Sequence, residues 1–487
     1  MNVKYRLRAL VSTEEAGGMG RNVTYAFAAQ GIALLSGFVM TLIVPKMLGV
    51  TEYAHWQLFL FYAGYVAVTM LGVGDGLYLR LGGMSYGDLD RPGIKTEFLV
   101  VAASQLLLAA LAWLGSLFFE IEPDSRFVLS SVLLYLVVQN AYGFMAPVFQ
   151  AVNLTRIYSI GTVASKTTFV AILIVLLALG DKSYEPIVLA YIVGMGASLA
   201  YCLVCARSVL RASPKPLTRE SRQILEDVRI GLRVMVAYYA SSLIVGVARQ
   251  IIVMCWGLET FGQMSFAFSL ISFVLVFIAQ FSMVLFPVLR RLDLDQLKEK
   301  YEQIRDFLYV AAPLAYLLYL PASIILVAWL PEYRDSIKYL GILMPMFVFD
   351  GETNMLYSTY LKVYGDTKQL LNFNLAALAM SLATSCVGAY LFNSVEFVVY
   401  GLIGAIMLRS VLCGWYLSTR RLQCKWMRQT AAECCFACLF MAAVAAGNTV
   451  ALLVVSLSGY ILLIAACPRS FSSVANLLKE RLGRGES

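Results

Sequence analysis

Long apolar runs separated by short charged stretches recur along the whole chain. Most runs reach about 20 residues with few charges, which is the length that a helix needs to cross the hydrocarbon core of a bilayer. They lack the alternation of apolar and polar positions that a membrane β-strand requires. The pattern therefore predicts an all-α, polytopic membrane protein with about fourteen transmembrane helices, or twelve if the two short runs at the end do not span. The predicted spans are residues 22–44, 54–79, 96–118, 127–149, 158–179, 187–206, 234–256, 263–288, 307–330, 337–361, 369–391, 396–418, 431–446 and 449–467.

One short phrase occurs twice and indicates two related halves. Residues 48–54 (LGVTEYA) and 256–262 (WGLETFG) each place a glycine, an acidic residue and an aromatic residue in a predicted loop before a long apolar helix that ends on arginine. A second pair of similar segments, NLTR at 153–156 and GDTK at 365–368, follows the fourth and tenth predicted spans. Because an even number of crossings separates the copies, the halves would be parallel repeats, which are typical of transporters.

These repeats and the connecting segments predict the organisation of the chain. The stretch SPKP followed by LTRESRQILEDVRIGLR predicts a surface helix that joins the halves. The predicted parts are a cytoplasmic N-terminal segment (1–21), an N-lobe of six helices (22–206), a cytoplasmic connector (207–233), a C-lobe of six helices (234–418), an accessory helix pair (431–467) and a cytoplasmic tail (468–487).

Composition agrees with a membrane protein, since 60% of the residues are hydrophobic and 14% are charged. Soluble domains have roughly 45–50% apolar and 25% charged residues. Lysine and arginine gather in one set of connections, which predicts that these connections and both termini lie on the cytoplasmic side of the inner (plasma) membrane. The net charge of +8 then serves topology, so nucleic-acid binding is not expected.

Metal and disulfide chemistry are not expected. His55 is the single histidine, and no pair of cysteines falls on the predicted outer face. The cluster of Cys434, Cys435 and Cys438 looks like half of a metal motif, but no second pair of ligands accompanies it. These cysteines are therefore interpreted as small packing residues in an apolar helix.

Three basic residues fall well inside predicted spans: Lys166, Arg249 and Arg409. A charge in the bilayer costs at least about 2.5–3.5 kcal/mol, so each should face a wet cavity or a partner. A diphosphate would be a suitable ligand, since arginine grips phosphate oxygens in bidentate fashion and lysine adds a point charge. The alternative is that each residue snorkels or pairs with a carboxylate.

The acids predicted inside the membrane are Asp75, Asp350 and Glu352. Asp350 and Glu352 are two residues apart and would point to different sides of a helix. Such a carboxylate could carry H⁺ or Na⁺ for antiport, or simply balance Arg249. Asp75 could instead sit at a hydrated helix end.

Polar and aromatic residues in the predicted spans could contact a glycan. Interhelical hydrogen bonds and interface belts are the alternative uses of the same residue types. The candidates for sugar contacts are Gln139, Asn140, Gln280, Tyr238, Tyr357 and Asn354.

No nucleotide cofactor is expected. The run Gly72, Gly74, Gly76 lacks the strand and the lysine of a phosphate loop, and helix packing or bending explains it better. Energy would then come from an ion gradient, the membrane potential or consumption of the product.

The segment LGVTEYAHWQLFLFYAGYVAVTMLGVGDGLYLRL, its partner GLETFGQMSFAFSL…FPVLRR and the stretch FQAVNLTRIYSIG resemble the polysaccharide or O-unit (Wzx-type) flippases of the multidrug/oligosaccharidyl-lipid/polysaccharide (MOP) superfamily. The resemblance implies two six-helix lobes that open a central cavity alternately to each face. It also implies transfer of an undecaprenyl-diphosphate-linked oligosaccharide from the cytoplasmic to the outer leaflet, for O-antigen or exopolysaccharide synthesis.

Three alternatives remain open. A lipid II flippase or an ion-coupled multidrug antiporter would share the fold, whereas a polysaccharide polymerase or ligase would be a membrane-embedded enzyme. The predicted outer loops are short and contain no histidine, which favours a transporter without enzymatic activity. We expect a monomer whose partners are the membrane, the lipid-linked oligosaccharide and, in assembly, polysaccharide polymerase proteins.

Overall fold

The computed structural model describes residues 19–474, and within this range every regular element is a helix. The all-α prediction is confirmed for this part of the chain. The predicted N-terminal segment (1–21) and the tail (468–487) lie mostly outside the described residues.

The chain divides into two compact units, Met1–Tyr239 and Ala240–Ser487. Helix α11 (Leu217–Leu289) begins in unit 1 and continues in unit 2. The other elements of unit 1 are α2 (Met19–Phe38), η1 (Val39–Ile43), α3 (Val44–Met47), α4 (Val50–Ala63), η2 (Val66–Met70), α5 (Val73–Leu81), η3 (Tyr86–Asp88), α6 (Arg91–Ser116), α7 (Pro123–Ala151), α8 (Thr155–Leu179), α9 (Tyr184–Cys205) and α10 (Arg207–Leu210). Unit 2 contains α12 (Leu294–Ala311), α13 (Leu314–Trp329), η4 (Pro331–Tyr333), α14 (Arg334–Glu352), η5 (Thr353–Tyr357), α15 (Ser358–Val363), α16 (Thr367–Tyr390), α17 (Val395–Tyr416), η6 (Leu417–Arg421), α18 (Met427–Ala445) and α19 (Thr449–Ala466).

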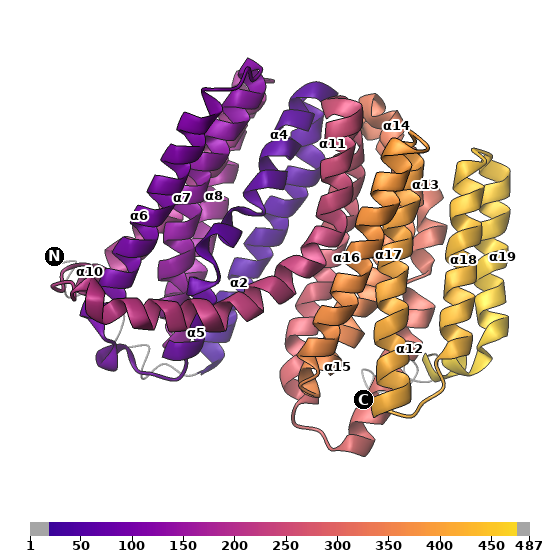
Figure 1. Cartoon of the computed structure of the whole chain (residues 1–487). Helices are drawn as coiled ribbons and strands as arrows, with labels where there is room; N and C mark the ends of the chain where they lie inside the picture. The colour runs from indigo at the N-terminus through magenta and orange to yellow at the C-terminus, as the bar shows by residue number, and fades with distance from the viewer. Residues whose placement is uncertain (1–18, 475–487) are drawn as a thin grey trace. The chain divides into compact units, whose positions relative to one another are not determined.

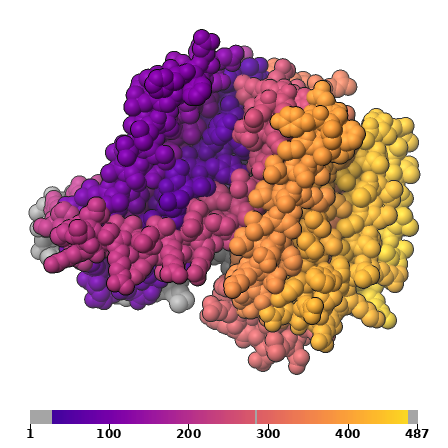
Figure 2. All heavy atoms as spheres, viewed as in Figure 1, coloured from indigo at the N-terminus to yellow at the C-terminus, as the bar shows by residue number. Residues whose placement is uncertain are grey.

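Within each unit, helices that follow one another along the chain pack as antiparallel neighbours. Figure 1 shows α6 beside α7 in unit 1, and α16 beside α17 and α18 beside α19 in unit 2. In Figure 2 the side chains of α16 and α17 form an orange surface of unit 2, with the yellow α18–α19 pair next to them. Buried apolar side chains of α5, α6 and α7 form a core in unit 1, and those of α12, η5, α15 and α17 form one in unit 2.

Within residues 19–474, eleven helices are long and apolar enough to cross a membrane. A twelfth is counted if the bent pair Val50–Met70 and Val73–Leu81 forms one span. The prediction of a polytopic membrane protein is confirmed, and the count of about fourteen stays a prediction. The difference arises partly from α11, a 73-residue helix that contains both predicted spans 234–256 and 263–288.

The break inside α11 is a single residue. The repeated phrase predicted a loop at 256–262, but the backbone leaves helical geometry only at Gly257, with φ 82° and ψ −174°. Glycine adopts this left-handed φ without a steric penalty, so one residue is enough to separate two helices. In the first copy of the phrase, Gly49 is the N-cap of α4 and the turn is short as well.

The helical stretch Val50–Met70, which contains α4 and η2, meets α5 at a bend of 59°. Two consecutive residues in left-handed conformation, Leu71 (φ 51°) and Gly72 (φ 77°), produce this change of direction. The first part of α11 lies directly against the bend, because a Cβ atom on Gly231 would come within 1.8 Å of the Gly72 carbonyl oxygen. Figure 1 shows this part of α11, in magenta, passing α5. Packing and bending at the glycine run therefore occur as its sequence predicted.

Candidate functional site

Two of the predicted site residues in unit 1 lie along one row of aromatic rings. The Lys166 ammonium of α8 lies 5.5 Å from the ring centroid of Tyr191 on α9. The Tyr191 ring is 5.6 Å from that of Tyr135 on α7, and the Tyr135 hydroxyl donates to Gln139 Oε1 at 3.1 Å. No ion pair joins Lys166 to any described residue. A cation, aromatic faces and an amide are thus brought together on three helices.

Asn140, the neighbour of Gln139, has a different environment. Its side chain is fully buried and its Nδ2 donates to Thr69 Oγ1 at 2.9 Å, to Gln105 Oε1 at 2.8 Å and to the Val66 carbonyl at 3.1 Å. These bonds tie α7 to η2 and α6. In this conformation Asn140 makes the interhelical contacts that were the alternative to sugar binding.

Unit 1 also buries charges that the sequence did not single out. Arg80 Nη2 on α5 donates to both oxygens of Glu97 on α6, at 2.6 and 2.7 Å. The same guanidinium donates to both oxygens of Asp227 in the first part of α11, at 2.7 and 3.1 Å. Both carboxylates are fully buried. We call Arg80, Glu97 and Asp227 the N-triad; it joins three helices through charge-assisted hydrogen bonds.

In unit 2, Arg409 and Asp350 form a buried ion pair. Arg409 on α17 is 3% exposed; its Nη2 donates to Asp350 Oδ1 on α14 and its Nη1 donates to Ser241 Oγ on α11 at 2.6 Å. The Asp350 carboxylate offsets the charge of Arg409, which is the carboxylate pairing that was the alternative to phosphate binding.

Glu352, two residues after Asp350, has other partners. Its Oε2 accepts from Ser410 Oγ at 3.2 Å and from the Tyr357 hydroxyl at 3.4 Å. Tyr357 lies in η5 and its hydroxyl in turn accepts from Arg305 Nη1 on α12 at 3.2 Å. All of these side chains are buried. Tyr357 is therefore enclosed within unit 2 in this conformation.

Glu433 on α18 completes this cluster. It is 3% exposed and its carboxyl lies within hydrogen-bonding range of the Glu352 carboxyl. We call Arg305, Glu352 and Glu433 the C-triad. Neither acid forms an ion pair with a residue that the structure describes.

The remaining predicted site residues are separate from the C-triad. Arg249 on α11 donates from Nη2 to Ser265 Oγ at 2.8 Å and lies 5.1 Å from the ring centroid of Phe261. Tyr238 is 65% exposed and its ring packs edge-on to that of Tyr239. The others are Asp75, exposed beside the bend of α4 and α5; Gln280, half-buried on α11; and Asn354, exposed on η5 with its carbonyl oxygen bonded to Ser282 Oγ.

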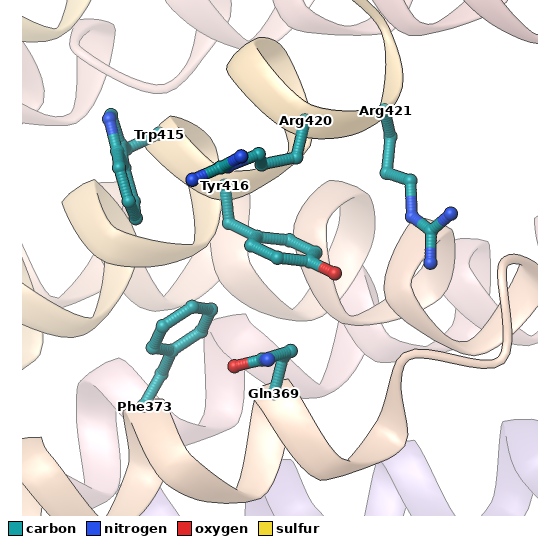
Figure 3. A pocket seen from close by; sticks show the side chains of 6 residues that line it. All are labelled: Gln369, Phe373, Trp415, Tyr416, Arg420 and Arg421. Atoms are coloured by element: carbon teal, nitrogen blue, oxygen red, sulfur yellow. The ribbon is translucent and has the colours of Figure 1, made fainter.

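A hollow of about 540 Å³ lies in unit 2 at the ends of α16 and α17. Figure 3 shows the Arg420 side chain extending over Tyr416 toward Trp415, with Gln369 and Phe373 opposite. Arg421 also lines the hollow, but its guanidinium donates to both oxygens of Asp366 at 2.5 and 2.7 Å. Arg420 therefore supplies the guanidinium whose charge is less compensated, next to aromatic faces that suit a sugar or a lipid headgroup.

Sequence reasoning missed the N-triad, Arg305 and Glu433. Arg305 lies two residues before the predicted span 307–330, so the sequence pattern places it in a connection. In the structure α12 begins at Leu294, where Asp293 and Gln296 form a capping box. The D-x-x-Q pattern at 293–296 is a sequence signal for this helix start. Glu433 lies inside the predicted span 431–446, and an acid in an apolar run was a usable signal as well.

Comparison with known proteins gives the family. The model of the family described as "Polysaccharide biosynthesis protein" matches residues 19–293, more than half of the sequence. The chain belongs to this family. No curated protein matches the sequence.

Several solved structures share the fold of this chain. The lipid II flippase MurJ, in an inward closed conformation, is similar with a TM-score of 0.66 and 10% identity, over 92% of this chain and 99% of that chain. An inward-facing multidrug resistance MATE family transporter of the MOP superfamily has a TM-score of 0.58 and 13% identity, over 80% and 93%. A MATE protein in the straight conformation has a TM-score of 0.51 and 15% identity, over 82% and 94%.

At these identities the structural matches show the fold, and the family model shows the family. The expected polysaccharide family is therefore confirmed by the family model, and the expected fold of MOP superfamily transporters by the structural matches. The similar solved structures are those of a flippase and of transporters, which agrees with the predicted transporter fold.

Proposed function

We propose that this chain transfers an undecaprenyl-diphosphate-linked oligosaccharide from the cytoplasmic to the outer leaflet of the inner membrane, for O-antigen or exopolysaccharide synthesis. The observation that carries the proposal is the match of residues 19–293 to a polysaccharide biosynthesis family, on a chain with a MOP transporter fold. Transfer would proceed by alternating access of the two predicted lobes. The chain would act as a monomer with both termini in the cytoplasm, and would deliver its product to polysaccharide polymerase and assembly proteins.

Lys166 is the strongest candidate for the diphosphate among the three predicted cations. It lies inside α8 without a carboxylate partner among the described residues, whereas Asp350 already offsets Arg409. The neighbouring Tyr191, Tyr135 and Gln139 offer aromatic faces and an amide that suit sugar rings and hydroxyls. Arg249 remains a candidate, and Arg420 in the hollow of Figure 3 is a second place where phosphate oxygens could bind.

Export of surface glycan and transfer between leaflets in proteoliposomes test the proposal. We expect Lys166→Ala, Arg249→Ala and Arg409→Ala each to abolish export while membrane insertion stays normal, and Lys166→Arg to restore part of it. Lys182→Ala, which changes an exposed loop lysine, is the matched control. Unchanged export in the three alanine variants would overturn the cationic site.

The reaction class is tested in the same vesicles. Leaflet transfer without a change in covalent bonds is expected, and new glycosidic bonds would indicate a polymerase or ligase instead. Transfer of lipid II in place of a longer lipid-linked oligosaccharide would support the lipid II flippase alternative.

A further inference from the structure

The C-triad contains two buried carboxyls that meet each other rather than a cation. Glu352 ends α14 and Glu433 lies in the second turn of α18, and their side chains are 2% and 3% exposed. The two carboxyls lie within hydrogen-bonding range of each other. An ionised carboxylate can only accept hydrogen bonds, so two ionised groups at this range would repel each other.

One buried carboxyl oxygen of the pair lacks a hydrogen-bond partner, and a bound proton would provide a donor within the pair. Glu352 Oε2 accepts from Tyr357 and Ser410, whereas the buried Oε2 of Glu433 accepts from no described residue. A protonated carboxyl has an O–H donor, which can bond the facing carboxylate and leave both groups satisfied. The geometry therefore fits one proton for two carboxyls.

The charge balance of the C-triad also predicts one bound proton. Arg305 is the nearest cation, and its N–H groups donate to neutral acceptors: Gln429 at 2.6 Å, Thr430 at 2.6 Å, Tyr357 at 3.2 Å and the Trp426 carbonyl at 3.4 Å. It reaches Glu352 only through the Tyr357 hydroxyl. One guanidinium against two carboxylates leaves one negative charge, and an uncompensated charge in a buried membrane site is strongly unfavourable. One bound proton makes the C-triad neutral.

We propose that Glu352 and Glu433 bind one proton between them, and that the site is loaded and emptied during transport. The binding of the proton stands on the geometry of unit 2. Its use in transport rests on the proposed flippase function.

Two other cations lie on the helices around the pair: Asp350 offsets the charge of Arg409 on α17, and Arg428 on α18 is exposed. Tyr316 on α13 is 1% exposed, and its hydroxyl has no hydrogen-bond partner in the described part of the chain. The remaining titratable groups nearby are Cys434 and Cys438 on α18, Cys467 after α19, and Tyr309 on α12. Thiols and phenols carry no positive charge in either protonation state. These tyrosine and cysteine side chains can form hydrogen bonds, but they cannot supply the positive charge that a bound proton provides.

A metal cation fits this site less well than a proton. Hard cations take several oxygen ligands. Among the described residues, no group of three or more histidine, cysteine, aspartate or glutamate side chains could hold a metal ion. Labelling of the carboxyls with and without sodium distinguishes the two ions.

Release of the proton would affect the packing of α18 against α14. Two like charges would then face each other across the contact between these helices, and repulsion would favour their separation. This gives the predicted accessory pair 431–467 a role, because it contributes one of the two carboxyls. The proton would thus couple the C-lobe to a helix pair that lies outside the internal repeat.

Labelling with dicyclohexylcarbodiimide tests the site independently of transport, because this reagent modifies protonated carboxyls in apolar surroundings. The probe is applied to the purified full chain, and the modified peptides are identified by mass spectrometry. We expect label on Glu352 or Glu433 at mildly acidic pH and a loss of label at alkaline pH. Sodium at constant pH should leave the label unchanged.

The substitutions make the prediction specific. In Glu352→Gln, Glu433 becomes the single acid facing Arg305 and should ionise, so its label is lost; Glu433→Gln should abolish the label on Glu352 in the same way. Glu396→Gln, which changes an acid at the start of α17, should leave labelling unchanged. Glu433→Leu is the second variant if the glutamine variant does not fold. Label that persists on the remaining acid, no label in the unsubstituted chain, or protection by sodium would each overturn the proton site.

A second measurement separates this inference from the proposed function. In proteoliposomes, a pH gradient should stimulate leaflet transfer by the unsubstituted chain, and Glu433→Gln should lose that stimulation. Transfer that ignores the gradient in both proteins would overturn the coupling role. An absence of any lipid-linked substrate transfer, with the expected labelling intact, would overturn the flippase proposal and leave the proton site standing.

Discussion

The two units solve the same electrostatic problem in different ways. Each places one arginine with two buried carboxylates: Arg80, which is partly exposed, with Glu97 and Asp227 in unit 1, and the buried Arg305 with Glu352 and Glu433 in unit 2. In the N-triad the guanidinium donates directly to both acids. In the C-triad it donates to neutral groups, and the acids meet each other.

The difference shows that geometry, and not composition, decides what such a cluster can do. Direct bonds of 2.6–2.7 Å in the N-triad satisfy the carboxylates as ions and fix three helices together. The C-triad leaves one carboxyl oxygen without a donor among the described residues. The first arrangement is suited to holding the connector on the N-terminal half, and the second is suited to gaining and losing a proton.

Arg80→Ala should have the largest effect on stability. It leaves two buried carboxylates without their cation, and breaking a buried pair in this way costs about 3–5 kcal/mol. We expect a lower unfolding midpoint of the purified chain and faster proteolysis of the first part of α11. Arg222→Ala, which removes a 90% exposed arginine from the same part of α11, is the control and should change stability by less than about 0.5 kcal/mol. Equal effects of the two substitutions would contradict the assignment of the N-triad as a structural tie.

The two triads should respond differently when a glutamate becomes a glutamine. Glu97→Gln removes a carboxylate that accepts two bonds from Arg80 and should cost about 1.5–3 kcal/mol. Glu433→Gln resembles the neutral acid that already occupies the site and should cost less than about 1 kcal/mol. Denaturant unfolding of both variants under one condition measures the contrast. A reversed order would remove the distinction between the two clusters.

The close contact beneath the N-triad predicts a smaller effect. A Cβ on Gly231 would lie 1.8 Å from the Gly72 carbonyl oxygen, so Gly231→Ala must push α11 away from α5 at a cost of about 1–3 kcal/mol. Gly115→Ala on α6 meets no atom within 4 Å and serves as the matched control. If the thermal midpoints of the two variants are the same, α11 is not held at this contact.

Much of the fold follows from hydropathy, because a membrane requires each spanning helix to be a continuous apolar run. The run Gly72, Gly74, Gly76 likewise predicted close helix packing. Its partner Gly231 could not be predicted, since local patterns do not encode which distant segments pair. For the same reason the cations Lys166, Arg249 and Arg409 could be found in the sequence, whereas the pairing of Arg409 with Asp350 needed the structure.

The C-triad illustrates the other reason for missed residues. Arg305 counts as a loop residue only if α12 begins at 307. The capping box at Asp293 places the start of α12 at Leu294 instead, fewer than four helical turns earlier in the chain. Glu433 was within a predicted span, but only the fold brings it to Glu352. Charge inventories of membrane chains therefore depend on helix ends as much as on hydropathy.

The smallest effect is expected from an exposed ion pair beside the N-triad. Lys215 donates to Asp90, and this hydrogen bond raises the pKa of Lys215 above its ordinary value of 10.5. A raised folded-state pKa stabilises the folded state below the ordinary pKa, and this contribution is lost as the pH rises through the folded value. Both side chains are well exposed, so the contribution should be less than about 1 kcal/mol and should fall with added salt. The stability difference between the unsubstituted chain and Asp90→Asn should therefore shrink at strongly alkaline pH. A difference that stays constant there would instead show that Asp90 acts by capping α6, since its side chain accepts a hydrogen bond from the Gly93 amide.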